Sequence, residues 1–189
     1  MKKRFFIVLS VLFAVLMLTS LPVMAASKAK EARKAFVSAI ENGQVDVYAG
    51  SSSAVEDADG DGVPELMIFN EKGGPQIDIY AYKSGKVVRV VSHDCEYTMY
   101  YNAAKKTFHE VGEGDGGWRI DYKLKGDGFK ELRKYYGYKH GEEQHATKTV
   151  NGKEKEISYK LYKKAMNNAS KGNALKKRTK KALIKYLKK

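Results

Sequence analysis

The sequence predicts an α+β domain with an N-terminal helix, an antiparallel β-meander of about six to eight strands and two C-terminal helices. Near the N-terminus, apolar residues recur at the three- and four-residue spacing of an amphipathic helix. Between residues 66 and 150, short runs of β-branched and aromatic residues are separated by clusters of Gly, Asn, Asp and Lys. Helical spacing returns after residue 152, and the length of 189 residues suits one ordinary domain.

Residues 1–26 have the composition of a secretory signal peptide. Basic residues occupy positions 2–4, an apolar run covers residues 5–18, and the segment ends in the small residues Ala25 and Ala26. The alternative is an uncleaved membrane anchor, but the apolar run is shorter than the roughly 20 residues that a membrane-spanning helix needs. The sequence therefore predicts cleavage near Ala25 and Ala26 and a secreted or cell-surface location.

The first element of the mature chain is predicted as a short amphipathic helix. Ser27 can cap its start, and Ala32, Phe36 and Ile40 fall on one face. The Asn-Gly pair at residues 42–43 is a typical helix stop. The mature chain is therefore predicted to begin with a helix that buries one apolar face.

Strands are predicted over most of the central part of the chain. The apolar run 66–69 is too short for a helix and follows Pro64, which indicates a buried strand. Residues 76–82 alternate apolar with polar side chains, and a Ser-Gly turn joins them to the β-branched residues 86–91, which predicts a hairpin. Further strands are predicted over residues 97–101, 107–111, 118–124, 129–138 and 147–150.

Two helices are predicted to complete the chain. After the Asn-Gly turn at residues 151–152, Ile157, Leu161 and Ala165 recur at helical spacing, and a second apolar stripe runs from residue 174 to residue 187. The predicted organisation is a signal peptide over residues 1–26, an α+β domain with the acidic loop described below over residues 27–170, and a basic amphipathic helix over residues 171–189.

Positive charge is concentrated at the C-terminal end. Residues 157–189 contain twelve Lys or Arg and no Asp or Glu; removing these and the three basic residues of the leader from the formal charge of +13 leaves residues 27–156 with −2. Such asymmetry predicts contact with an anionic cell-wall polymer or lipid surface, and the alternative is a solvated helix face. No nucleic-acid partner is expected in that compartment, and a monomer is expected. The predicted contact residues are Lys176, Lys177, Arg178, Lys180, Lys181 and Lys185.

The sequence contains no recognisable catalytic motif. Cys95 is the single cysteine, which excludes an internal disulfide and suits a small buried side chain better than a nucleophile. No Gly-x-Ser-x-Gly elbow, His-Glu-x-x-His pair or phosphate loop is present, so no catalytic residue is predicted. Two alternatives stay open. One is a secreted hydrolase with dispersed carboxylates, and the other is an adaptor or inhibitor that uses the tyrosine-rich face of the sheet.

An acidic loop before the first predicted strand has the composition of a calcium site. Calcium takes six to eight oxygen ligands at about 2.3–2.6 Å, so several carboxylates and carbonyls must converge on one point. Aspartates stand here at every second position, and Gly60 and Gly62 between them permit tight backbone turns. The sequence predicts one bound Ca²⁺, mainly structural, whose ligands are Asp57, Asp59, Asp61, the carbonyl of Val63 and Glu65.

The loop begins like an EF-hand but does not end like one. Ile68 stands where an EF-hand places its bidentate glutamate, and Pro64 obstructs a helix at the exit. The loop instead resembles the Asp-x-Asp-x-Asp-Gly-x-x-Asp/Glu loops of integrin-type FG-GAP repeats, in which the ninth residue closes the site and a strand follows. Glu65 stands at that ninth position.

A wider resemblance covers most of the mature chain. The segments DGDGVPEL at residues 59–66, IYAYKSGKV at residues 79–87 and VNGKE at residues 150–154 are similar to small secreted proteins of Gram-positive gut bacteria, clostridia among them. Those proteins have an N-terminal helix, one such acidic loop and a tyrosine-rich sheet, and their biochemical role is unassigned. Only the acidic loop is specific, and the resemblance implies an exported calcium-binding domain.

Overall fold

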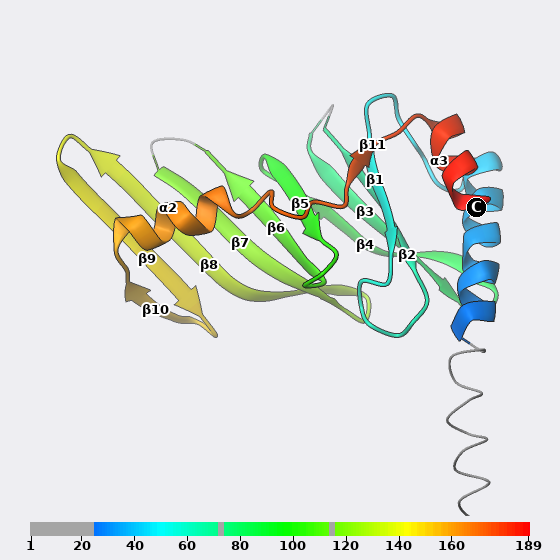
Figure 1. The fold of residues 1–189 in the computed structure, drawn as a ribbon, viewed down its shortest axis with the longest axis horizontal. Coiled ribbons are helices and arrows are strands. Elements are labelled where there is room, and N and C mark those ends of the chain that lie inside the picture. The colour runs from blue at the N-terminus through cyan, green and yellow to red at the C-terminus, as the bar shows by residue number, and fades with distance from the viewer. Residues whose placement is uncertain (1–24, 72–73, 114–115) are drawn as a thin grey trace, which may run out of the picture.

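The computed structural model describes residues 25–71, 74–113 and 116–189. In these ranges the chain forms three helices and eleven strands in two antiparallel sheets, which confirms the predicted α+β class (Figure 1). Figure 1 places the N-terminal helix and the C-terminal helix at one end of the molecule and strands β9 and β10 at the other. Residues 1–24 of the predicted signal peptide lie outside the described residues.

The first sheet contains five strands in the order β11-β1-β2-β3-β4. Strands β1 to β4 form a meander, and the short strand β11 pairs with the outer edge of β1. Because β11 comes from the C-terminal part of the chain, this edge is closed by residues more than 120 positions away from β1 in sequence. The strands are β1 (Ser52–Glu56), β2 (Glu65–Asn70), β3 (Gln76–Lys83), β4 (Lys86–Asp94) and β11 (Lys176–Lys177).

The second sheet is an uninterrupted meander of six strands in the order β10-β9-β8-β7-β6-β5. The turn between β9 and β10 is formed by Asn151 and Gly152, which both have positive φ, as the Asn-Gly pair predicts. The strands are β5 (Thr98–Asn102), β6 (Thr107–Gly112), β7 (Gly116–Lys125), β8 (Gly128–His140), β9 (Glu143–Val150) and β10 (Lys153–Glu156).

The helices begin at different residues from those predicted. The described part of the N-terminal helix covers residues 25–41, so Ser27 does not cap it, and the Ser27 hydroxyl instead bonds Glu31 within the helix. Helix α2 (Tyr159–Asn167) is capped by Ser158, because β10 occupies the residues just before it. Helix α3 (Lys180–Leu187) is capped by Thr179, so the apolar residues at 174 and 175 precede the helix.

Strand β2 is buried on both faces and separates two hydrophobic cores. Met67 and Phe69 face a core that also contains Tyr101 and Phe108 of the second sheet. Leu66 and Ile68 face the opposite core, which contains Phe36 of the N-terminal helix. The C-terminal helix completes that second core with Leu183 and Leu187. The terminal helices therefore cover one face of the first sheet, and the second sheet packs against the other face.

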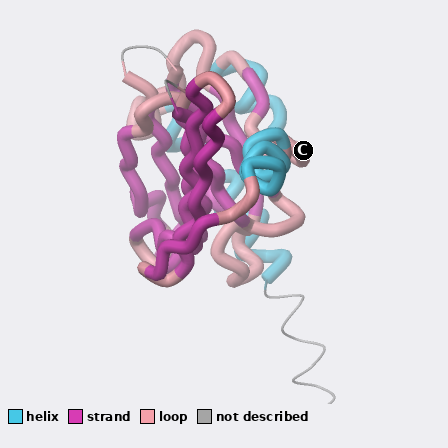
Figure 2. The backbone as a smooth tube through the Cα atoms, turned by 90° about the vertical axis from the view of Figure 1, so that its left-hand side faces the viewer, coloured by secondary structure: helices cyan, strands magenta, loops and turns pink. Residues whose placement is uncertain are grey.

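Helix α2 covers part of the second sheet and contacts β7, β8 and β9. Figure 2, turned by 90°, shows α2 nearly end-on beside the strands. Tyr162 of the helix is buried against Tyr135 and Ala146. Gly137 permits this contact, because a Cβ atom at that position would lie 2.9 Å from the Tyr162 ring.

Three short strands, β1, β10 and β11, are absent from the predicted set, which explains why the structure exceeds the expected strand number. The tyrosines of the predicted alternative binding face divide between exposed and buried positions. Tyr97 and Tyr136 are exposed, but Tyr80, Tyr101 and Tyr135 are buried.

Among the described residues, no helix combines the length and apolar character that crossing a membrane requires.

Candidate metal centre

The acidic loop is the connection of a β-hairpin. Strands β1 and β2 are antiparallel, and their last pair joins Glu56 to Glu65, so residues 57–64 form the loop between them. Gly60 and Gly62 have φ values of +96° and +87°, which side chains with a Cβ rarely adopt. The two glycines thus let the backbone curl tightly enough for the three neighbouring aspartates to face a common point.

The three aspartates of the loop lie together. One carboxylate oxygen from each of Asp57, Asp59 and Asp61 falls within 4.8 Å of the other two. Two ligands on opposite sides of a calcium ion are separated by roughly 4.6–5.2 Å, twice the usual bond length. This spacing is therefore compatible with a single ion that contacts all three aspartates.

Each aspartate also holds the loop in shape through one of its oxygens. The Oδ1 atoms of Asp57, Asp59 and Asp61 accept hydrogen bonds from the backbone N–H groups of residues 60, 61 and 63, at 2.7, 3.1 and 2.7 Å. Such local bonds are typical of turns that Asp and Asn form with their own backbone. The second oxygen of Asp59 and of Asp61 has no bond to another described residue, which leaves it able to meet a cation.

Glu65 lies behind the loop at the start of β2. Only 2% of the residue is exposed, and its Oε2 atom accepts a bond of 2.8 Å from the N–H of Ala58. Burial raises the pKa of Glu65 to about 7, and the charges of Asp59 and Asp61 add to this shift. Glu65 is not part of the group of three aspartates. As a ligand it would contact the ion from the side of the loop that faces the protein interior.

Val63 has a mainly structural place in the loop. Its N–H donates to Asp61, and its side chain is buried in the core beneath the terminal helices. These contacts fix the loop at the residue whose carbonyl is the predicted ligand. The direction of that carbonyl stays a prediction.

A lysine from the second sheet reaches the loop. Lys106, in the turn between β5 and β6, places its Nζ atom 2.7 Å from Oδ2 of Asp57. Burial acts to raise the pKa of Asp57, but the bond and charge of Lys106 together with backbone N–H groups of the loop outweigh it and hold the pKa below its usual value of 3.8. With four carboxylates ionised, one ammonium leaves three negative charges uncompensated, which a divalent cation can offset.

The hydroxyl of Tyr101 is a buried polar group near the same loop. It has no hydrogen-bond partner among the described residues. Burial raises the pKa of Tyr101, and the negative charges of Glu56, Glu65 and Asp57 raise it further.

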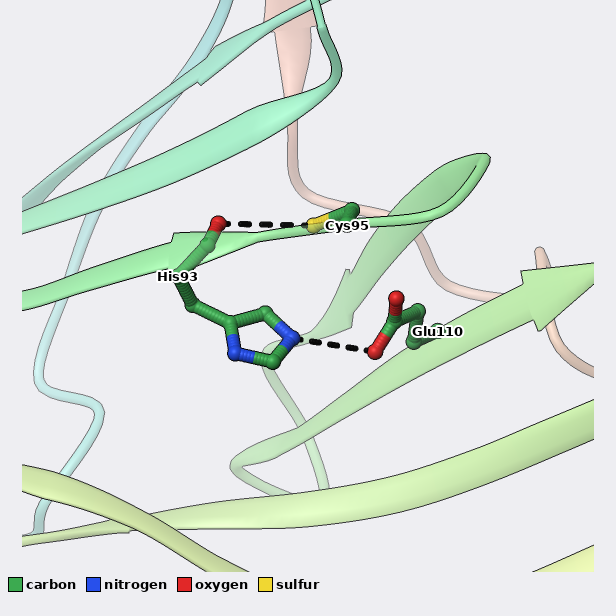
Figure 3. Close-up of side chains that lie close together, drawn as sticks. All are labelled: His93, Cys95 and Glu110. Atoms are coloured by element: carbon green, nitrogen blue, oxygen red, sulfur yellow. Dashed lines mark hydrogen bonds and ion pairs between the residues drawn. The ribbon is translucent and has the colours of Figure 1, made fainter.

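A second cluster of ligand-type side chains joins the two sheets (Figure 3). The Nε2 atom of His93, at the end of β4, lies 3.0 Å from Oε2 of Glu110 in β6, toward which the ring points in Figure 3. The other Glu110 oxygen accepts a 3.0 Å bond from the N–H of Glu96, and Tyr122 donates its hydroxyl to Oε2. These contacts make Glu110 a buried link between the sheets.

Cys95 completes this cluster as a protonated thiol. Its sulfur lies 3.7 Å from the carbonyl oxygen of His93, and the residue is buried. Burial raises the pKa of Cys95 to about 12, and the nearby Glu110 charge adds to the shift. Because the thiolate is the nucleophilic form, this environment does not activate the cysteine. Glu110 was missed at the sequence level, although a charged residue within a core strand pattern is itself a signal.

Comparisons with known proteins add little to this geometry. No protein-family model matches the chain, and no curated protein matches it. A solved structure described as "Structure of a Xanthomonas Type IV Secretion System related protein" is 13% identical to this chain. The match covers 55% of this chain and 56% of that chain with a TM-score of 0.39. The chain thus spans little more than half the length of that structure.

Proposed function

We propose that this chain is an exported, non-enzymatic calcium-binding domain in which one Ca²⁺ fixes the hairpin loop between β1 and β2. The observation that carries the proposal is the convergence of three aspartate oxygens within 4.8 Å, next to a buried glutamate. Asp57, Asp59, Asp61 and Glu65 supply carboxylate oxygens, and the carbonyl of Val63 supplies a further one. This set of hard oxygen donors suits calcium.

The ion acts on the stability of the hairpin. Without it, the loop carboxylates repel one another and Glu65 holds a proton near neutral pH. With it, these charges are compensated at the point where the chain enters the doubly buried strand β2. The expected dissociation constant is on the order of 10⁻⁴–10⁻³ M, which suits extracellular calcium.

The experiment is thermal unfolding of chelator-treated mature protein with and without millimolar calcium. Asp59 and Asp61 are exposed, so D59N/D61N removes the negative charge of two ligands with little loss of packing. The matched control is E142Q/E143Q, which removes two carboxylates from the exposed turn between β8 and β9. Calcium is expected to raise the Tm of the wild type and the control but not of D59N/D61N. A rise that persists in D59N/D61N, or none in the wild type, refutes the proposal.

The second part of the proposal is attachment to an anionic cell-wall polymer or lipid surface. Two members of the predicted basic set have internal roles: Lys177 pairs with Glu71, and Arg178 donates to the Ser53 carbonyl and lies over the Tyr186 ring. The exposed residues Lys176, Lys180, Lys181 and Lys185 have no ion pair among the described residues. These four lysines are therefore the proposed contact, and the last three of them belong to α3.

Deleting the tail would not test this attachment, because Leu183 and Leu187 belong to the core. The sharper variant is K180Q/K181Q/K185Q, with K153Q/K155Q/K160Q as a control of equal charge on exposed positions around β10 and α2. The first variant is expected to wash off whole cells at lower salt than the wild type, and the control is not. Equal retention of all three proteins refutes the attachment.

A further inference from the structure

A pocket with a volume of about 500 Å³ lies between helix α2 and the second sheet. Its wall on one side consists of residues from β6, β7 and β8, and on the other side of residues from α2. Figure 1 shows the helix running across the end of the second sheet where β7, β8 and β9 lie, the three strands that it contacts. The volume is within the range of about 300–1,000 Å³ that is usual for small-molecule sites. None of its lining residues belongs to the proposed metal centre.

The pocket is strongly positive. Five basic side chains line it, and Asp121 is the single carboxylate among its lining residues. With the lining histidine neutral, the formal charge of the wall is therefore +4. The basic residues are Lys105, Arg119, Lys123, Arg133 and Lys164.

A buried network forms one part of the wall. Asp121 accepts from Nε of Arg119 at 2.6 Å, and its Oδ2 atom lies 2.9 Å from Nε of Arg133. Its Oδ1 atom also lies 2.7 Å from Nδ1 of His109. Burial acts to raise the pKa of Asp121, but His109 and Arg119 outweigh it and hold that pKa below its usual value. Asp121 thus accepts a hydrogen bond from Arg119 and forms an ion pair with Arg133, and it compensates only one of their two charges.

Three lysines at the rim leave the remaining charge uncompensated. Lys105 lies in the β5–β6 turn, Lys123 in β7 and Lys164 in α2, and none of them has an ion pair among the described residues. Three ammonium groups from separate elements around one cavity repel one another unless an anion lies between them. Leu132 and Leu161 also line the pocket and offer apolar contact to an uncharged part of a ligand.

We infer that this pocket binds a small molecule that carries a phosphoryl group. A phosphate monoester carries close to two negative charges near neutral pH and presents three oxygens to donors from different directions. It compensates more of the +4 charge of the wall than one carboxylate does, and its oxygens can accept hydrogen bonds from the exposed lysines and from the partly exposed guanidinium of Arg133. This inference is independent of calcium binding, because it uses different residues.

The test measures binding of inorganic phosphate and glycerol phosphate to calcium-free mature protein by titration calorimetry. The variant K123Q/K164Q removes two rim charges from exposed positions. The matched control K125Q/K163Q removes two exposed lysines from the same strand and the same helix that do not line the pocket. Phosphate affinity is expected to fall about tenfold or more in K123Q/K164Q and to change less than about twofold in the control.

Three outcomes overturn the inference. The first is absence of heat on adding phosphate to the wild type at millimolar concentrations. The second is an equal loss of affinity in K123Q/K164Q and K125Q/K163Q, which indicates attraction by net charge alone. The third is acetate or citrate binding as tightly as phosphate, which replaces the phosphoryl group by a carboxylate. Unchanged far-UV circular dichroism in both variants verifies that the fold is intact.

Discussion

Replacement of Glu65 by glutamine is expected to stabilise the calcium-free protein at alkaline pH. The buried Glu65 carboxyl faces the charges of Asp59 and Asp61, and its pKa is about 7 in the folded chain instead of 4.5. The glutamine side chain of E65Q would keep an oxygen for the N–H of Ala58 but carry no charge. The substitution therefore removes the repulsion while preserving the shape of the site.

The magnitude follows from proton linkage. Because the folded state holds the Glu65 proton more tightly than the unfolded state, the contribution of this group to stability is fully present below pH 4.5. It is lost as the pH rises through 7. A rise in the pKa from 4.5 to about 7, at about 1.4 kcal/mol per pH unit, gives a loss of about 3–4 kcal/mol. The advantage of E65Q over the wild type should grow by about that amount between pH 4.5 and pH 8.

The assay is urea unfolding of both proteins in the presence of chelator at several pH values between 4 and 8.5. The difference between the two free energies of unfolding removes the titration of all other groups that the proteins share. E142Q is the control for loss of one carboxylate at an exposed turn. A difference that stays constant across this pH range would refute the reasoning about Glu65. In calcium, E65Q should lose most of the stabilisation that the ion gives to the wild type.

Three further predictions concern other parts of the fold. K106M should bind calcium about two- to fivefold more tightly by titration calorimetry, because the ammonium no longer occupies Asp57; equal affinity would contradict this. Cys95 should react with a thiol reagent about a thousandfold more slowly at pH 8 in the native than in the unfolded protein, since its pKa is about 12 instead of 9. G137A should lower the free energy of unfolding by about 1–3 kcal/mol in urea, because its Cβ meets the Tyr162 ring, whereas G128A, with open space around it, should not.

Local sequence patterns predict the regular part of this fold well. The hairpin of β3 and β4 follows from alternating side chains on either side of Ser84 and Gly85, which adopt φ values of 50° and 81°. Strand β1 was not predictable in this way, because its serines and alanine have no strong strand preference. Its residues become a strand through pairing with β2 on one side and β11 on the other.

The candidate metal centre also has one part that local sequence predicts and another part that depends on tertiary packing. The spacing of Asp57, Asp59 and Asp61 predicts their convergence, because a glycine-containing loop brings alternate residues to one side. Lys106 and the Tyr101 hydroxyl approach from the second sheet, so their place depends on how the two sheets pack. No local pattern encodes that packing, and the sequence could therefore give the loop ligands but not the residues that tune their charge.

The C-terminal strand β11 has a consequence for the order of folding. Lys176 and Lys177 close the edge of β1, and Leu183 and Leu187 pack against the N-terminal helix. The first sheet therefore completes its edge and its core only when segments more than 120 positions apart meet, and such distant contacts slow folding.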